Sequence, residues 1–524
     1  MNALDRAIAY VAPQRAAARA RARGVVAYYE AAEATRLHKR RRDGGSGDAE
    51  VLRAGRSLRV MARHLDQNHD LARGALNVLV ANVVGPHGIT PEPQPRRADG
   101  SIHTDFAKAL LALWRDWVRA PEVAQQLTWP MAQRMVARTW LRDGEVLIQH
   151  LEGAVPQLDH GTRVPYSIEL IEPDLLPFDY TDAARGIVAG VERNAWGRPR
   201  TYHVYRQHPG DVFAGALSTT ALKPLPARAV THLKLTDRIG QARGVSIFAA
   251  VLNRLDDLKD YEESERVAAK VAASMAAYIK KGSPDLYEAA NPDPQADPAT
   301  PRNMMMRAGM IFDDLRPGEE IGTIDSKRPN PNAGAWRNDQ LRAVSAGLGA
   351  GYSSMARMYE GTYNARRQEM VESWVLYEML QRQFVDALVR PVWERFVANA
   401  IAARVVTVPA DVVPDTADDA HYQGPVMPAL DPLKEVGANV MAEQAGYVSG
   451  PAIIRARGGN PDEVLEQEAA WRRKAADRGV AMISNPATQG AIVPPADPNP
   501  DNPDDTETDT EDAALPAARL GGLR

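Results

Sequence analysis

One stretch of the chain, residues 229–271, constrains the fold more than any other, because a short strand passes through a polar turn into a long helix. Residues 230–235 (VTHLKL) are short, apolar in part and bounded by turn residues, which is typical of a strand. The turn 238–244 (RIGQARG) follows, and helical spacing of apolar residues then predicts a helix over about 245–281. The chain therefore needs a sheet-containing body with a helical extension.

The last turns of this predicted helix are rich in alanine and would have an unusually smooth surface. Small side chains let helix axes approach closely. The residues are Ala268, Ala269, Ala272, Ala273, Ala276 and Ala277. In a monomer they would pack on another helix of the same core, and in a ring they would suit packing against a neighbouring subunit.

Length and composition place the protein among large globular chains. With 524 residues it is too long for one hydrophobic core, and 44% hydrophobic and 25% charged residues are ordinary values. Cysteine is absent, which excludes disulfides, Cys-ligated zinc and a thiol nucleophile. No apolar run reaches 18 residues and no secretory signal is recognisable, so we expect no contact with a membrane.

Charge is unevenly distributed along the chain. Eight acids and no Lys or Arg lie between positions 485 and 518, so the net charge of −4 leaves +4 for the rest. A net charge of +4 is low for a protein that is specialised to hold DNA tightly. The segment 484–524 is too poor in apolar residues to fold alone, and residues 1–50 form a basic arm with the cluster Arg40, Arg41 and Arg42. The arm is most simply solvated.

Periodicity predicts an α+β organisation without regular βαβ alternation. The predicted helices cover about 51–84, 105–118, 129–142, 245–281, 336–348, 366–403, 432–445 and 461–478. The predicted strands cover 145–149, 166–171, 187–192, 200–206, 230–235, 310–312 and 321–324, with a hairpin turn at 194–199. Trp114 and Trp117 are expected to anchor the core. Pro391 lies inside a predicted helix, where it should produce a kink.

A search for an active site finds none. The chain has no phosphate-binding loop, no H-E-x-x-H and no G-x-S-x-G, and residues 347–351 (GLGAG) lack dinucleotide-binding spacing. The pairs His64/His69 and His203/His208 have no consistent carboxylate frame for a metal. We therefore expect no enzyme, no cofactor and no metal, and any ATP hydrolysis would belong to a partner.

Short motifs in fixed order over residues 56–474 resemble the portal proteins of lambda-type phages. They are 81–85 (ANVVG) with Gly88, 143–145 (DGE), 171–175 (IEPDL), 190–192 (GVE), 197–199 (GRP), Tyr202, His203, His232, 238–244, 315–319 (LRPGE), 347–349 (GLG) and 431–435 (DPLKE). One segment departs from the family pattern. Where a Tyr-Ser-Ser-Ala-Arg-like run is usual, this chain has 359–367 (YEGTYNARR).

The resemblance implies a portal fold with an α/β wing, a long-helix stem, a small β-containing clip, a helical crown and a disordered acidic tail. The implied boundaries are 1–50 arm, 51–244 wing, 245–281 first stem helix, 282–334 clip, 335–348 second stem helix, 349–365 channel loop, 366–430 kinked helix and return to the wing, 431–483 crown and 484–524 tail.

The resemblance also implies a function and a set of residues. A ring of twelve subunits in the virion, assembled in the host cytoplasm, would pass double-stranded DNA during packaging and ejection. Implied partners are the terminase large subunit, the head–tail connector, and the major capsid and scaffold proteins. The channel loop would present Ser353, Ser354, Arg357, Tyr359, Asn364, Arg366 and Arg367 to DNA. The stem would pack through Ala269, Ala273 and Ala276, and the wing–stem junction would use Arg238, Gly240, Gln241, Arg243 and Gly244.

Two other classes of function compete with this one. A DNA-binding protein that acts as a monomer or dimer would explain the basic arm and would bind DNA tightly and salt-sensitively. A purely structural capsid or scaffold protein would explain the missing active site. It would not explain two long helices around a Pro/Asp-rich insert.

Overall fold

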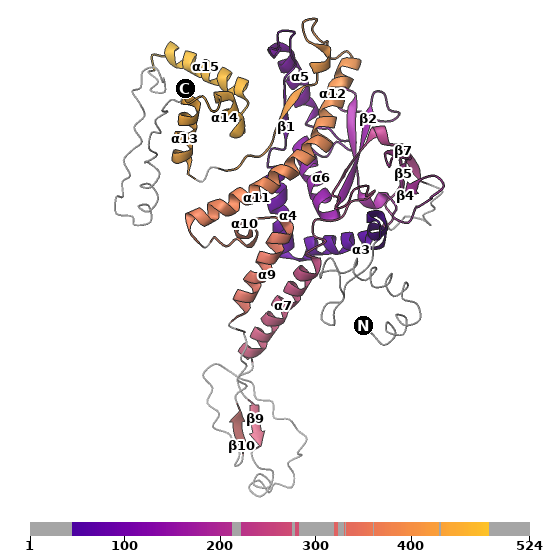
Figure 1. Ribbon diagram of the computed structural model, residues 1–524, viewed down its shortest axis with the longest axis vertical. Helices are drawn as coiled ribbons and strands as arrows, with labels where there is room; N and C mark the ends of the chain where they lie inside the picture. The colour runs from indigo at the N-terminus through magenta and orange to yellow at the C-terminus, as the bar shows by residue number, and fades with distance from the viewer. Residues whose placement is uncertain are drawn as a thin grey trace, which may run out of the picture.

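The computed structural model describes residues 45–211, 222–274, 278–281, 319–322, 330, 332–359, 361–428 and 431–480. Outside the described residues lie positions 1–44 of the predicted N-terminal arm, most of the predicted clip, Ala276 and the acidic tail. The last residues of the predicted arm, 47–50, instead begin the first helix of the body. Figure 1 shows a mixed helix-and-sheet body, with the helix pair α7 (Leu252–Ser274) and α9 (Ala333–Leu348) projecting from one end. Three helices are set to one side: α13 (Pro432–Gln444), α14 (Gly450–Ala456) and α15 (Pro461–Asp477).

Four helices cover the body: α3 (Gly47–Asn68), α4 (Asp70–Val83), α5 (Thr104–Trp117) and α6 (Trp129–Asp143). A single helix was predicted over 51–84, and the structure corrects this with a break at His69, whose backbone is extended (φ −126°, ψ 113°). The His69 ring Nε2 lies 3.1 Å from the carbonyl oxygen of Leu255 in α7. This distant contact holds His69 at the junction of α3 and α4.

Two antiparallel sheets complete the body. The first has the order β3 (Tyr166–Ile171), β2 (Glu145–Glu152), β8 (Val230–Lys234), and the second is β4 (Ile187–Val188), β5 (Val191–Arg193), β6 (Pro199–Val204), β7 (Lys223–Pro226). The predicted strand 187–192 is therefore two strands. Gly190, with φ +81°, makes the tight turn between them. Strands β1 (Thr90–Pro93) and β11 (Ala420–Gln423) were not predicted, and they pair with each other.

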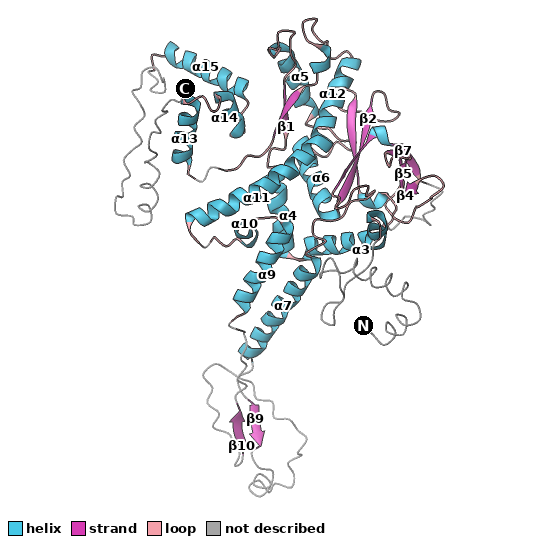
Figure 2. Cartoon of the chain, in the orientation of Figure 1, coloured by secondary structure: helices cyan, strands magenta, loops and turns pink. Residues whose placement is uncertain are grey.

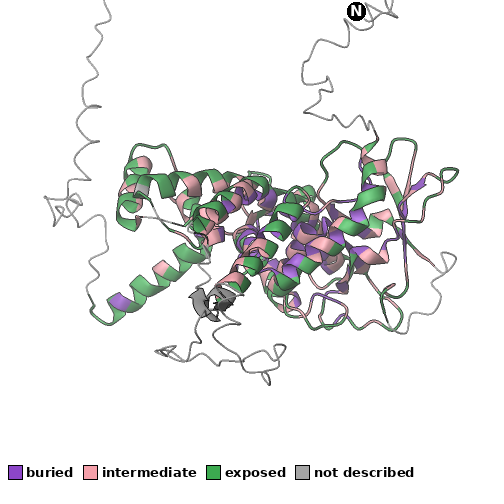
Figure 3. Ribbon diagram, turned by 90° about the horizontal axis from the view of Figure 1, so that it is seen from below, coloured by how far each residue is buried: buried purple, intermediate pink, exposed green. Residues whose placement is uncertain are grey.

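Aromatic side chains fill the main core, as predicted. The rings of Trp114 and Trp117 stack with centroids 4.8 Å apart. Phe396 of α12 (Arg390–Ala402) lies nearly perpendicular to Trp114, with ring centroids 5.0 Å apart. All three side chains are buried. Buried residues concentrate in the body, whereas the helices at its periphery are largely exposed (Figure 3).

Helices α7 (Leu252–Ser274) and α9 (Ala333–Leu348) lie side by side (Figure 2). The helix predicted over 245–281 is shorter at both ends. Residues 246–251 form turns that bury Phe248 and Val251, and Tyr278–Lys281 is strand β9, paired with β10 (Glu319–Gly322). The predicted strand 310–312 lies outside the described residues. The second predicted strand, 321–324, overlaps β10, and its partner among the described residues is β9.

The remaining helices follow α9. Helix α10 (Tyr352–Ala356) was predicted as loop; then come α11 (Tyr363–Phe384), a π-helical turn η5 (Val385–Val389) and α12 (Arg390–Ala402). Short 3₁₀ turns are η2 (Pro173–Leu175), η4 (Ala227–Ala229) and η6 (Pro414–Thr416). The last helices are α13 (Pro432–Gln444), α14 (Gly450–Ala456), which was not predicted, and α15 (Pro461–Asp477).

Side-chain caps explain where α13 and α15 begin. Asp431 and Asn460 each accept hydrogen bonds from two backbone N–H groups of the first turn, and proline occupies an early position in both helices. Salt bridges Lys108–Glu466 and Arg115–Glu463 connect α5 to α15. Within the described ranges, none of the helices combines the length and the apolar character that a membrane span requires.

Candidate functional site

The candidate site is the junction where the first sheet passes into α7. Helix α6 ends at Gly144 in the left-handed conformation, and β2 starts at the next residue. The chain returning from β8 crosses this point, because the Leu235 N–H donates to the Gly144 carbonyl at 2.8 Å. A Cβ atom on Gly244 would lie 2.0 Å from the Gly144 oxygen, so the crossing requires glycine there.

Glu145 is at the centre of the junction and is completely buried. Its carboxylate accepts hydrogen bonds from Arg59 Nη2 at 2.6 Å, Arg243 Nε at 2.8 Å and the Gly244 N–H at 2.8 Å, and it lies 3.0 Å from His232 Nε2. Burial alone would raise the pKa of Glu145, but Arg243, His232 and Arg59 outweigh it and hold the pKa well below its usual range. The carboxylate is therefore ionised.

Arg243 connects this carboxylate to the second sheet. Its Nη1 donates to the carbonyl oxygens of Leu176 and Ala189, both at 2.9 Å, and its guanidinium lies over the Phe178 ring, 4.1 Å from the centroid. Burial lowers the pKa of Arg243, with Glu145 opposing that shift. Because one planar guanidinium bonds three separate segments, the position of each segment is fixed relative to the others.

The outer part of the turn is tied to the start of α3. Asp48 accepts from the Ala242 N–H at 2.7 Å and pairs with Arg193 of β5, also at 2.7 Å. Gln241 is buried and donates through Nε2 to the Arg243 carbonyl at 2.7 Å. These contacts hold the turn against both the sheet and the helix.

The residues predicted for the junction thus divide into two groups. Gln241, Arg243 and Gly244 are buried, whereas Gly240 and Arg238 are exposed. Of the buried three, Arg243 and Gly244 bond Glu145 directly, and Gln241 bonds the Arg243 carbonyl. Arg238 reaches the Gly45 carbonyl at 2.7 Å and Glu50 at 3.3 Å.

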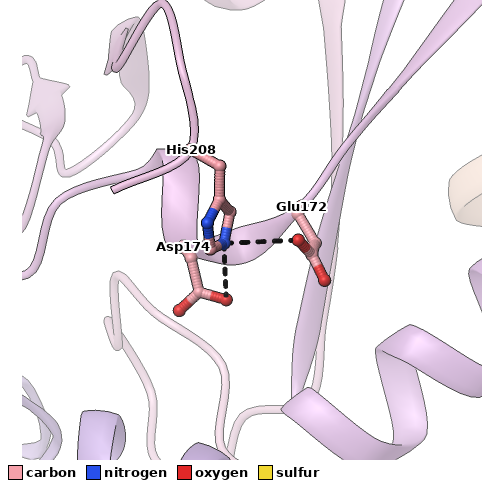
Figure 4. A group of neighbouring side chains, drawn as sticks. All are labelled: Glu172, Asp174 and His208. Atoms are coloured by element: carbon pink, nitrogen blue, oxygen red, sulfur yellow. Dashed lines mark ion pairs between the residues drawn. The ribbon is translucent and has the colours of Figure 1, made fainter. Parts of the chain in front are cut away.

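A second group of ionisable side chains lies beside the junction. Glu172, Asp174 and His208 bring ligand-type atoms within 4.8 Å of one another, which the sequence did not indicate (Figure 4). Arg63 pairs with both carboxylates, and Arg59 Nη1 lies 3.3 Å from Asp174. Two guanidinium groups already neutralise these acids, so the donor set fits an ion-pair network better than a metal centre.

The predicted channel-loop residues gather around α10 and the start of α11. Ser353 donates through Oγ to Glu369 at 2.6 Å, and its backbone N–H donates to the same carboxylate at 2.8 Å. Ser354 is half-buried. The exposed residues of this group are Arg357, Tyr359, Asn364, Arg366 and Arg367. Ser353 is thus bonded to α11 through Glu369, whereas the arginines of the predicted channel loop are exposed to solvent.

The stem residues and Pro391 occupy separate places. Ala269 is half-buried on α7, Ala273 belongs to the same helix, and Ala276 lies outside the described residues. Helices α7 and α9 are joined by Arg337–Glu262 at 2.6 Å. Pro391 lies in the first turn of α12, directly after the π-helical turn.

Sequence reasoning missed three members of the junction: Arg59, Glu145 as its centre, and Asp174. The motif 143–145 marked the position without revealing its role. The only sequence signal for a buried ionic cluster was the occurrence of charged residues inside otherwise apolar periodic segments. This signal is weak, because charged residues are usually exposed to solvent.

Comparison with known proteins identifies the family. Residues 33–381 match the phage portal proteins of the lambda family. The chain is 24% identical over 506 residues to a probable portal protein of Halomonas phage phiHAP-1, covering 92% of this chain and 93% of the relative. It is 25% identical over 419 residues to portal protein B of Escherichia phage lambda, covering 74% and 76%. The chain belongs to the lambda family of phage portal proteins.

Solved structures give a weaker likeness. A chain of the native gene transfer agent virion matches with a TM-score of 0.40 and 13% identity, covering 82% of this chain and 97% of that chain. A chain from the neck of the native particle matches with a TM-score of 0.38, also at 13% identity, covering 80% and 96%. TM-scores this low do not establish a shared fold, so the assignment depends on the sequence match.

Proposed function

We propose that twelve copies of this chain form a ring at one vertex of the capsid and that double-stranded DNA passes through its channel during packaging and ejection. The family assignment supports this role, and the observation that carries it is the buried joint from which α7 and α9 project. The role is mechanical. The terminase large subunit would supply ATP hydrolysis, and this chain would not act as an enzyme.

We assign the parts of the proposed ring to the helices and strands as the family resemblance implies. The body with α12 would be the wing, α7 with α9 the stem, β9 with β10 part of the clip, and α13, α14 and α15 the crown. The clip would bind first terminase and later the head–tail connector. The wing would contact the major capsid and scaffold proteins, and the finished ring would reside in the virion after assembly in the host cytoplasm.

The junction would set the angle between wing and stem. A closed ring repeats one subunit contact around its axis, so a small error in this angle would recur in every copy. Glu145, Arg59 and Arg243 are buried and mutually bonded, and a packed ionic joint of this kind resists bending. The joint would therefore serve closure of the ring.

The exposed end of the channel loop would face DNA. Arg357, Arg366 and Arg367 are exposed and have no carboxylate partner among the described residues. Arginine contacts to phosphates are blind to base sequence, and each adds salt-dependent affinity. A few such contacts, flanked by the polar Tyr359 and Asn364, suit a duplex that must slide.

Mass photometry of the purified full chain tests the proposal. We expect a species of about twelve times 57.2 kDa, alone or with the capsid and scaffold proteins, and negative-stain images of rings with a central hole. Single copies under all these conditions would contradict the proposal. Tight, salt-sensitive DNA binding by the single subunit would favour the DNA-binding alternative instead.

A further inference from the structure

The second sheet carries a cavity that the proposed function does not use. It has a volume of about 450 Å³ and lies at strands β6 and β7. Its lining is basic and apolar, with no acidic residue: Arg198, Pro199, Arg200, Tyr202, Pro226, Ala227 and Arg228. We call these residues, with Trp196, the arginine pocket.

The three arginines of the pocket are exposed, and none forms an ion pair with a carboxylate in the described part of the chain. Other arginines of the same region do: Arg193 pairs with Asp48, and Arg185 pairs with Glu192. Three unpaired guanidinium groups around one cavity create a locally positive potential. Such a site favours an anionic ligand.

Trp196 stands beside the pocket at the tip of the β5–β6 hairpin and is 95% exposed. The turn that carries it is ordered by Asn194, whose Oδ1 accepts from the N–H groups of Trp196 at 3.0 Å and Arg198 at 2.9 Å. Trp196 and Arg198 are therefore exposed on an ordered turn, and tryptophan and arginine are among the residue types that dominate binding energy at protein interfaces.

We infer that the arginine pocket binds the acidic, proline-rich segment 494–512 of this chain, from the same or a neighbouring copy. The segment carries five prolines and eight acids, with no Lys or Arg. Carboxylates can pair bidentately with arginines, and proline-rich peptides dock in extended form on exposed aromatic rings. The acids of the segment complement the arginines of the pocket, and its prolines complement the exposed indole of Trp196. This double match identifies the segment as the occupant.

Because the segment is covalently attached to the chain that carries the pocket, even a modest affinity of the segment for the pocket is sufficient for binding. The segment belongs to the same chain, and a tethered ligand reaches effective concentrations on the order of millimolar where its tether spans the two sites. The inference goes beyond the proposed function and does not depend on it, since the pocket lies within one subunit and can bind whether or not a ring closes.

A nucleic acid is the other anionic candidate. Phosphates would also pair with the arginines, but the backbone of a duplex offers no apolar partner for the Trp196 indole or for the prolines of the pocket wall. The observations therefore favour a peptide, and a DNA duplex serves as the competing probe.

The test uses the full chain with its eight tail acids replaced by Asn and Gln, so that the chain's own segment cannot compete. A fluorescein-labelled peptide of residues 491–513 is titrated in and followed by anisotropy. We expect binding that weakens with salt, at least about tenfold weaker binding in Arg198→Glu/Arg200→Glu, and clearly weaker binding in Trp196→Ala. Arg119→Glu, at an exposed arginine outside the pocket, should change little.

The unmodified chain supplies a second readout. Its own tail should compete, so the labelled peptide should bind more weakly to it, and Trp196 should be protected from hydroxyl-radical oxidation relative to the neutralised chain. Absence of peptide binding, or equal binding by the Arg198→Glu/Arg200→Glu variant, would overturn the inference. A 20-bp duplex bound through the same arginines without peptide binding would overturn it too.

Discussion

Arg243 lies against Glu145 with Nε at 2.8 Å and Nη2 at 2.6 Å from Oε1, and both side chains are fully buried. Residues almost one hundred positions apart thus form one ionic joint at the base of α7. Buried pairs of this kind add little net stability relative to apolar residues, but removing one partner strands the other in a medium of low dielectric. The joint is therefore a sensitive place to test the architecture.

Glu145→Ala should lower the free energy of unfolding by about 3–5 kcal/mol, because Arg59 and Arg243 would be buried without a counter-charge. Urea denaturation followed by tryptophan fluorescence measures this. Glu378→Ala is the matched control, since it breaks the exposed pair with Arg382 and should cost about 0.3–0.5 kcal/mol. Similar destabilisation of the two variants would contradict a buried joint.

His150 should make stability depend on pH. Burial, with Arg395 nearby, lowers the pKa of His150 to about 3, and the ring lies between the hydroxyls of Tyr166 and Thr231. Protonation favours the unfolded chain, in which the pKa is about 6.5. Stability is then full above that pH and falls at about 1.4 kcal/mol per pH unit on acidification towards the folded pKa.

His150→Gln removes this contribution. Its unfolding free energy, measured in urea from about pH 4 to 7, should change less steeply than that of the unmodified chain. Parallel curves for the two proteins would show that the folded state does not hold His150 neutral.

Gly244→Ala should prevent correct closure of the junction, because its Cβ atom would lie 2.0 Å from the Gly144 oxygen and 2.8 Å from Glu145 Cβ. We expect destabilisation by about 3 kcal/mol or more, read as a lower thermal midpoint and soluble yield. Gly437→Ala in α13 meets no atom within 4 Å and should stabilise by about 0.4–1 kcal/mol. An unchanged thermal midpoint and soluble yield in Gly244→Ala would contradict the close approach of Gly244 to the Gly144 carbonyl.

Arg366→Ala and Arg367→Ala should change DNA retention or packaged DNA length more than ring assembly. Both residues are exposed near the start of α11, and removing a guanidinium that pairs with a phosphate weakens DNA binding without altering the fold. Packaged length measured by gel, beside ring counts by negative stain, checks this. Arg382→Ala, further along the same helix, is the control. Normal rings with normal packaged DNA in both variants would count against a DNA-facing loop.

Ala273→Trp should block ring closure, because closed symmetry repeats a single clash at every interface. Negative-stain microscopy should show few or no complete rings, while circular dichroism shows retained helix. Ala273→Ser, a change of one atom, should leave rings intact. Complete rings formed by Ala273→Trp would contradict packing of α7 against a neighbour.

Local pattern predicted many elements closely. Strand β3 has the predicted bounds, 166–171, and α15 begins at Pro461 after the Asn460 cap, because alternation and capping are properties of adjacent residues. The break at His69 was not predictable in this way. It accompanies a contact with Leu255, 186 positions away, which no local window contains.

The residues of the candidate site likewise include some that local sequence pattern indicated and some that it did not. The turn 238–244 and the family motifs were recognisable from the sequence, and they led to the lambda family of portal proteins. The sequence could not distinguish the exposed Arg238 from the buried Arg243, because both are arginines in one polar turn. It also did not indicate that Glu172, Asp174 and His208 would meet.

Sequence alone determined the family, most of the long helices, the aromatic core residues Trp114 and Trp117 and the acidic composition of residues 485–518, because these depend on residue type and near-neighbour spacing. The tertiary structure decided which charges are buried, where Glu145 finds its partners and where the unpaired arginines gather. Burial and pairing arise from segments that are distant in the chain and close in space. A linear pattern carries no measure of that proximity.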